Sequence, residues 1–219
     1  MKLTELLCSI SKKTKAMVKR LKAAERKASI LAVAKVLFAD KGYHGVSVDE
    51  IARRLGVSPA ILYQHFSSKE VLYEEVLSEN SAKRESYIEA ILTEPSDFVS
   101  VISRMTRIYL ENVAEDPDFL RMELMSALEG SRTATSFFER RWRSITDYIE
   151  YSLNELKSDQ HYMYLNPRLA GLMYQGMLRE VLYTKFINED SRYKDIPLET
   201  MSDELIKMFV RAIGLNKNN

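Results

Sequence analysis

The chain has 219 residues and a formal net charge of +1, with 46% hydrophobic and 29% charged residues. This composition is typical of soluble globular proteins and excludes a disordered chain, and the single cysteine, Cys8, excludes a disulfide-stapled secreted scaffold. No stretch reaches the roughly 18 uncharged apolar residues of a membrane span. The apolar run from Leu3 to Ile10 is interrupted by Glu5, unlike a signal peptide. We therefore expect a cytoplasmic protein with no membrane partner.

Apolar residues recur at spacings of three and four through most of the chain, which is the period of an α-helix. Glycine and proline are scarce, at 7 and 5 residues, and no sustained strand pattern occurs. We predict an all-α fold. In chain order, the predicted helices cover residues 21–40, 48–55, 59–65, 68 to just before Pro95, 97–115, 118–129, 133–158, 167–188 and 200–213.

Charge is distributed unevenly over these helices. Residues 1–75 hold 14 Lys and Arg against 8 Asp and Glu, a net charge of +6, whereas residues 76–219 hold 18 against 23, a net charge of −5. A basic segment joined to an acidic one indicates an anionic ligand at the basic end. The alternative is that the lysines form an ordinary solvated face.

Three helix starts lie close together in the first third of the chain. Ser47–Glu50 and Ser67–Glu70 are S-x-x-E capping boxes, in which a hydroxyl and a carboxylate satisfy free backbone amides reciprocally. Between them, Ser58 is a favourable N-cap and Pro59 follows at the first helical position. The turn between the first two of these helices contains Gly56, and such a short glycine turn is typical of a helix-turn-helix unit.

The third helix carries the chemistry expected at a nucleic-acid interface. Tyr63 can donate a hydrogen bond to phosphate, Gln64 can pair with an adenine edge, and Ala60 can contact a thymine methyl group. The alternative is that Tyr63 and Phe66 are both core aromatics. The predicted DNA-contacting residues are Ser47, Ser58, Pro59, Ala60, Ile61, Tyr63, Gln64, His65 and Lys69.

The segments LGVS (55–58), LYQHF (62–66) and SKE (68–70) resemble the N-terminal DNA-binding domain of TetR-family transcriptional regulators. The resemblance extends over about Ala28 to Leu77. It implies a three-helix domain in which the second short helix reads double-stranded DNA, followed by a helical domain for ligand sensing and dimerisation. By resemblance, Ser47, Tyr63, His65 and Lys69 contact phosphates, while Pro59, Ala60, Ile61 and Gln64 face the bases.

The charge pattern and the resemblance together predict three parts. These are a basic N-terminal arm at 1–20, a helix-turn-helix DNA-binding domain at 21–75, and a helical regulatory and dimerisation domain at 76–219. The arm holds six Lys and Arg against Glu5 alone. It can attract DNA through its charge, or it can be an extension of the first helix or a disordered tail.

The last two predicted helices are candidates for the dimer interface that the resemblance implies. Gly176 permits a close approach of backbones, and two helices from each of two subunits would form a four-helix bundle. The alternative is that the same residues are buried within their own chain. The predicted interface residues are Leu169, Leu172, Met173, Gly176, Met177, Val181, Leu205, Met208 and Phe209.

Methionine and aromatic residues on the middle helices are candidates for a ligand pocket, because such side chains adapt to apolar ligands. The same pattern is also that of an ordinary helical core. The predicted pocket residues are Met105, Tyr109, Met122, Met125, Phe138, Trp142 and Tyr174.

No catalytic motif, metal-ligand spacing or dinucleotide fingerprint occurs, so we expect no enzyme activity, no metal and no cofactor. We expect a homodimeric repressor that binds a pseudo-palindromic operator and is released by a small apolar or amphipathic effector. A helical adaptor that does not bind DNA and a helical enzyme with scattered catalytic residues are the alternatives.

Overall fold

The computed structural model describes residues 3–79, 97–130, 132–156 and 165–215. In these ranges the chain is mostly helical and contains no strand, which confirms the predicted all-α fold. The chain forms two compact units, residues 1–76 and 77–219. No helix in the described ranges has the length and hydropathy needed to cross a membrane.

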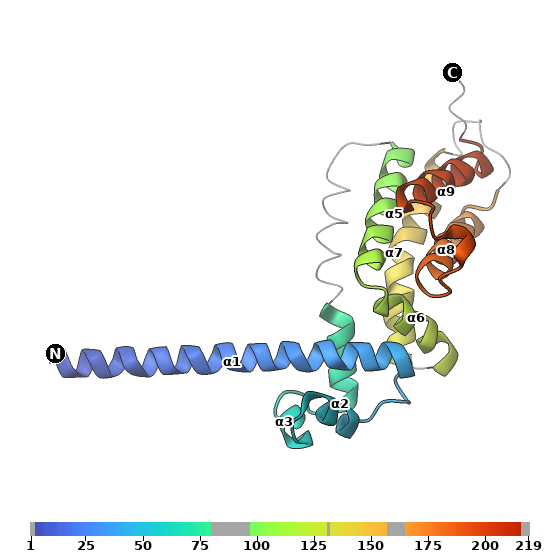
Figure 1. The fold of residues 1–219 in the computed structure, drawn as a ribbon. Coiled ribbons are helices and arrows are strands. Elements are labelled where there is room, and N and C mark those ends of the chain that lie inside the picture. The colour runs from blue at the N-terminus through green and yellow to red at the C-terminus, as the bar shows by residue number, and fades with distance from the viewer. Residues whose placement is uncertain (1–2, 80–96, 131, 157–164, 216–219) are drawn as a thin grey trace. The chain divides into compact units, whose positions relative to one another are not determined.

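The first unit contains α1 (Leu3–Lys41), α2 (Val48–Leu55), α3 (Pro59–Tyr63) and the start of a helix whose described part covers residues 69–79 (Figure 1). The helix α1 begins at Leu3 rather than at residue 21, which agrees with the alternative in which the basic segment 1–20 extends the first helix. The reason lies in the sequence, because neither glycine nor proline occurs before Gly42 and no helix-stop signal precedes it.

The core of the first unit lies where α1 covers the two short helices. Ile30, Ala34 and Phe38 of α1 are fully buried, as are Ile51 of α2 and Leu62 of α3. Helices of eight and five residues are too short to be stable in isolation, so this apolar contact holds them in place.

The two predicted capping boxes are only partly formed. Ser47 caps α2 by accepting a hydrogen bond from the backbone N–H of Glu50 at 3.1 Å. The Glu50 carboxylate accepts a hydrogen bond from Lys41 at the end of α1 and thereby ties α1 to α2. At the second box the cap is Ser68 rather than Ser67, because Ser68 Oγ accepts from the N–H of Val71 at 3.3 Å.

Gly56 ends α2 in the left-handed conformation, with φ of 69° and ψ of 31°. A side chain at this position would strain the backbone. The chain then turns through Val57 and Ser58 into α3, which ends at Tyr63, two residues earlier than predicted. The predicted helix-turn-helix connection is therefore present.

The second unit contains five α-helices and one short 3₁₀ helix in its described part. They are α5 (Phe98–Glu115), α6 (Asp118–Glu129), α7 (Arg132–Leu156), α8 (Pro167–Phe186), η2 (Ser191–Tyr193) and α9 (Leu198–Ala212). Within it α7 packs along α8 and α5 packs along α9. The predicted bounds of α6 are reproduced at both ends, and those of the other α-helices are within two residues.

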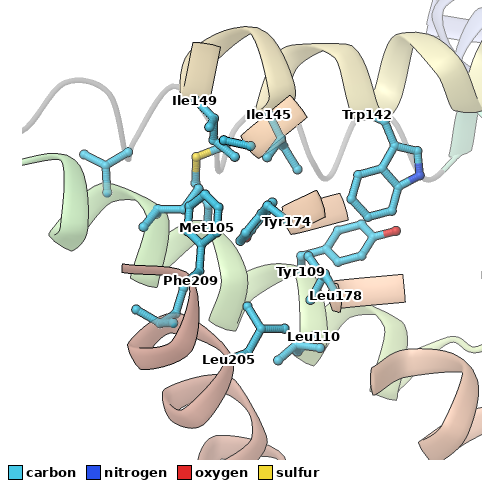
Figure 2. Packing of buried hydrophobic residues seen from close by; sticks show 14 of the residues in the cluster. Met105, Tyr109, Leu110, Trp142, Ile145, Ile149, Tyr174, Leu178, Leu205 and Phe209 are labelled. Atoms are coloured by element: carbon cyan, nitrogen blue, oxygen red, sulfur yellow. The ribbon is translucent and has the colours of Figure 1, made fainter. Parts of the chain in front are cut away.

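Tyr174 of α8 lies at the centre of the second unit's core (Figure 2). Its ring lies 5.1 Å from that of Phe209, and its hydroxyl shares a 2.7 Å hydrogen bond with Thr106. Thr106 in turn donates to the carbonyl of Ile102, so Tyr174 is the donor of the shared bond. Burial raises the pKa of Tyr174 above its ordinary range. The buried hydroxyl is thus satisfied without water.

Candidate DNA-binding site and ligand cavity

The helix α3 presents a polar and small-residue face away from the core. Tyr63 is 54% exposed, and Ala60 and Gln64 are exposed beside it. Pro59 and Ile61 are half-buried. The exposed groups are one phenol, one carboxamide and one methyl group, which suit phosphate, an adenine edge and a thymine methyl group respectively.

Leu62 and Phe66 hold this face outward. Both are buried, at 1% and 3% exposure, whereas Tyr63, which lies between them in the sequence, is 54% exposed. The alternative in which Tyr63 and Phe66 are both core aromatics is therefore wrong for Tyr63. His65 is half-buried, with its ring 6.3 Å from that of Phe66.

The serines predicted to contact DNA are both exposed at helix starts. The oxygen of Ser47 caps α2, and its hydroxyl hydrogen is still able to reach a phosphate at the helix N-terminus. Ser58 holds the N-cap position of α3 without a capping bond from its side chain. Its backbone carbonyl instead accepts from the N–H of Ile61 at 3.0 Å.

Lys69 is engaged within the protein. Its ammonium group donates to the backbone carbonyls of Tyr43 at 2.9 Å and Val46 at 3.0 Å, and it lies 4.2 Å from the centre of the Tyr43 ring. Two of its three N–H groups are therefore used to hold the α1–α2 loop. The prediction of a phosphate contact rests on the third N–H group alone.

A second link joins the same loop to the helix of residues 69–79. The hydroxyl of Tyr43 donates to the carboxylate of Glu70 at 2.6 Å. This bond, with further hydrogen bonds from the backbone amide of Glu70 and from Ser68, lowers the pKa of Glu70 to about 2. Burial together with Glu70 raises the pKa of Tyr43. The Glu70 carboxylate is thus ionised at neutral pH, and an ionised carboxylate accepts a stronger hydrogen bond from the phenol hydroxyl than a protonated one does.

Two exposed arginines at the end of α2, Arg53 and Arg54, were not among the predicted contacts. Their signal in the sequence is a pair of cations on the polar side of an amphipathic helix next to the turn. Guanidinium groups in such a place can bind phosphates.

A cavity of about 900 Å³ lies along α6, α7 and α8 in the second unit. Ligand pockets in proteins commonly have volumes of about 300–1,000 Å³. Its lining is formed by Glu123, Ser126, Ala127, Thr135, Phe138, Glu139, Trp142, Arg143, Thr146, Asp147, Glu150, Arg168, Leu169, Leu172, Gln175 and Arg179.

Of the seven predicted pocket residues, the structure brings Phe138 and Trp142 to this cavity. Met105, Tyr109 and Tyr174 belong to the packed core, in which Trp142 and Tyr109 lie at the opposite end from Phe209 (Figure 2). Two more predicted residues, Met122, which is fully buried, and Met125, which is half-buried, lie outside the cavity lining. The core alternative thus describes Met105, Tyr109 and Tyr174 better than the pocket does.

The cavity contains a polar cluster that the sequence analysis did not include. Glu123 of α6 is almost fully buried, and its Oε1 accepts from Trp142 Nε1 at 2.8 Å and from an Arg179 terminal nitrogen at 2.7 Å. The guanidinium carbon of Arg179 lies 5.6 Å from the centre of the Trp142 ring. A carboxylate among the buried apolar positions Leu120 and Met122 is the signal by which Glu123 could have been found.

The predicted dimer residues divide into two groups. Leu169, Leu172, Met173 and Met208 are exposed apolar side chains, Gly176 is exposed with open space where a Cβ would lie, and Met177 and Val181 are half-buried. Leu205 and Phe209 are buried at 3% and 1% exposure in their own core. Because the chain itself covers these two, the expectation that they contact a second subunit is corrected, and the exposed group carries the interface prediction.

No cluster of three or more His, Cys, Asp or Glu side chains that could hold a metal ion occurs in the described ranges.

Comparison with known proteins shows similarity to bacterial regulators, concentrated in the first unit. The sequence profile of "Bacterial regulatory proteins, tetR family" matches residues 30–76. The HTH-type transcriptional activator FasR of Mycolicibacterium smegmatis is 53% identical over 58 residues, which are 26% of this chain and 26% of FasR. The uncharacterised HTH-type regulator YuxN of Bacillus subtilis is 32% identical over 59% of this chain and 45% of its own length. The matched region thus spans less than half of either relative.

Solved structures share the fold along most of the chain. The regulator FadR of Bacillus subtilis, solved in complex with stearoyl-CoA, has a TM-score of 0.66 and 20% identity, over 85% of this chain and 98% of that one. AibR, solved with isovaleryl coenzyme A and operator DNA, has a TM-score of 0.64 and 21% identity, over 84% and 97%. The matched proteins are regulators and not enzymes. The N-terminal helix-turn-helix unit of the chain is thus similar in sequence to the DNA-binding domain of the tetR family of bacterial regulatory proteins.

Proposed function

We propose that the protein is a transcriptional regulator that binds double-stranded DNA as a homodimer through α3 and responds to a small molecule bound in its second unit. The observation that carries the proposal is the exposed face of α3, with Tyr63, Gln64 and Ala60 held outward by the buried Leu62 and Phe66. The net charge of +6 on residues 1–75 favours attraction to phosphates. A protein with this role works where the chromosome is, in the cytoplasm.

The recognition helix holds neither Arg nor Lys. Sequence reading therefore depends on the carboxamide of Gln64, on methyl contacts from Ala60 and Ile61, and on the shape of the duplex. Two such helices in a dimer would enter successive major grooves at half-sites one helical turn apart, about 34–36 Å, which makes the operator a pseudo-palindrome.

Two features support an effector site in the second unit. The cavity along α6, α7 and α8 has a volume suited to a small ligand. The structures of FadR and AibR, which share the fold, were solved with acyl-CoA ligands. In the proposed mechanism, the effector binds one arrangement of the dimer better than the other and so changes the spacing of the two recognition helices.

The direction of regulation is proposed as repression. A dimer bound across a promoter blocks access by RNA polymerase, and the relative IcaR of Staphylococcus aureus, 46% identical over 39 residues, is a negative regulator. FasR is an activator, so activation is the second candidate. Deleting the gene is expected to raise transcription of the genes beside the operator. A fall would favour activation.

A gel-shift assay on the DNA that flanks the protein's own gene tests DNA binding. We expect one fragment to bind more tightly than random DNA, with an affinity that falls steeply as salt rises. Tyr63→Ala is expected to weaken this binding at least about tenfold, because a phosphate contact is lost. The matched control is Tyr151→Ala, which removes a phenol that is 66% exposed on α7 in the other unit and should leave binding unchanged. Equal binding by wild type and Tyr63→Ala would contradict the proposed role of α3.

A further inference from the structure

The ion pair between Glu123 and Arg179, which both line the cavity, leaves two buried polar atoms without a hydrogen-bond partner. Both hydrogen bonds to the carboxylate, from Trp142 and from Arg179, end on Oε1. Glu123 Oε2 and Arg179 Nε are buried and have no hydrogen-bond partner among the described residues. A buried donor or acceptor without a partner costs free energy, which a ligand recovers if it supplies the partner.

The two unpartnered atoms are complementary to a particular kind of polar group. Oε2 of Glu123 accepts a hydrogen bond and Nε of Arg179 donates one, so the complementary group must itself donate and accept. The charges of the two residues offset each other. A ligand cation would be repelled by Arg179 and a ligand anion by Glu123, and each would lose its hydration on entering.

The rest of the cavity does not favour an anionic ligand. The lining carries four acidic side chains against three arginines. Arg179 is paired with Glu123 at 2.7 Å, and Arg168 is paired with Glu150 at 3.3 Å. The remaining charged side chains of the lining are one cation, Arg143, and two anions, Glu139 and Asp147. A coenzyme A ligand brings several phosphate charges, for which this lining has no excess of cations.

The apolar part of the lining provides a place for a nonpolar ligand body. Phe138 and Trp142 of α7 are the aromatic side chains of the lining. Burying apolar ligand surface against these two side chains supplies binding free energy, while the polar pair fixes the orientation.

We propose that the cavity along α6, α7 and α8 binds an uncharged ligand with an apolar or aromatic body and a polar group that both donates and accepts hydrogen bonds, such as a carboxamide or a hydroxyl group. This group is seated on Glu123 Oε2 and Arg179 Nε. The proposal specifies the class of ligand for the effector site proposed above. Ligand binding itself does not depend on the proposed function, and only the effect of the ligand on DNA binding rests on it.

Trp142 makes the site measurable, because it is the single tryptophan of the chain and lines the cavity. Its fluorescence in the full-length protein is titrated with three probes of similar size, the neutral phenylacetamide, the anion phenylacetate and the cation phenethylamine, and with isovaleryl-CoA. We expect a saturable change with phenylacetamide, and binding weaker by at least about tenfold for the two charged probes, since each loses one of the two hydrogen bonds. Isovaleryl-CoA is expected to bind no better than phenylacetate.

Two substitutions test the seat of the polar group. Glu123→Gln keeps the shape of the side chain and removes the carboxylate, and Arg179→Lys keeps the positive charge and removes the Nε–H donor. Each is expected to weaken phenylacetamide binding by about tenfold. Their matched controls, Glu111→Gln and Arg107→Lys, change exposed residues of α5 outside the cavity and should leave binding unchanged. If Glu123→Gln fails to fold, Arg179→Lys decides the question.

The proposal is overturned if phenylacetamide gives no saturable change, if phenylacetate or isovaleryl-CoA binds more tightly, or if Arg179→Lys binds phenylacetamide as wild type does. The regulator proposal fails separately. If phenylacetamide binds as expected and the gel shift shows no DNA binding, the ligand site stands and the proposed function falls.

Discussion

At the scale of single residues, Lys69 stabilises the α1–α2 loop through hydrogen bonds to its backbone. Its ammonium group holds two backbone carbonyls, those of Tyr43 and Val46. Ser47, the cap of α2, directly follows Val46, so the position of the helix-turn-helix unit depends on this contact. A lysine that binds phosphate only would have no such effect on the free protein.

Replacing Lys69 by Met should therefore destabilise the first unit. The two carbonyls lose a charged donor, and we expect the free energy of unfolding to fall by about 2 kcal/mol. Urea unfolding followed by far-ultraviolet circular dichroism measures the change. The control is Lys207→Met, which breaks an exposed ion pair with Glu204 on α9 and should cost less than about 1 kcal/mol. An unfolding curve of Lys69→Met that matches wild type would leave Lys69 as a phosphate contact alone.

The Tyr43–Glu70 bond predicts a pH dependence of stability. The Tyr43 hydroxyl makes the largest contribution, with others from the backbone amide of Glu70 and from Ser68, to lowering the pKa of Glu70 from 4.5 to about 2, so the ionised carboxylate favours the folded state. This contribution is complete above pH 4.5 and is lost as the pH falls towards 2. Tyr43→Phe should lower the thermal unfolding midpoint at pH 6, and the difference from wild type should shrink as the pH falls below 4.5.

The matched control for this experiment is Tyr183→Phe on α8, which removes a partly exposed phenol of the second unit. A difference between wild type and Tyr43→Phe that stays constant from pH 6 to pH 3 would show that Glu70 is not the group concerned.

At the scale of elements, α8 carries an exposed apolar stripe next to the cavity. Leu172 and Met173 are 60% and 54% exposed, and Gly176 lies one turn further along with open space above it. Gly171 is different, since a Cβ there would lie 3.3 Å from Thr146 of α7, so its close approach is within the chain. An apolar stripe of this kind is typical of a surface that a second subunit covers.

The dimer proposal predicts that Met173→Glu produces a monomer, because a charge would be buried against apolar side chains of the second subunit. Light scattering of the full-length protein measures the mass. The control is Leu128→Glu, which places the same charge on an apolar residue of α6 that is 86% exposed. If Met173→Glu and Leu128→Glu both remain dimeric, the interface lies elsewhere. If wild type is already a monomer, the dimer proposal is wrong.

Most of the helices could be predicted because their signals are local. The α6 bounds follow from Pro117 before it and Gly130 after it, and the helix-turn-helix connection follows from Gly56. What could not be predicted depends on contacts between elements. Three features follow only from the tertiary structure. Lys69 donates hydrogen bonds to loop carbonyls, the Glu50 carboxylate accepts from Lys41 instead of completing its capping box, and Leu205 and Phe209 are buried in their own core.

At the scale of the whole molecule, the net charge of +1 is the sum of a basic first part and an acidic second part. In the proposed regulator the basic part binds the phosphates, and the acidic part is disfavoured near them. Because near-neutral totals hide such divisions, the charge of the whole chain does not exclude DNA binding.

Selection of binding sites from a random pool of duplex DNA by the full-length protein tests the central claim most directly, since it needs no knowledge of the operator. The account predicts enrichment of one sequence with two inverted half-sites, about one helical turn apart from centre to centre. It also predicts that this enrichment is lost with Tyr63→Ala and kept with Tyr151→Ala. A pool that stays random after repeated rounds with the wild-type protein would contradict the claim that α3 reads DNA.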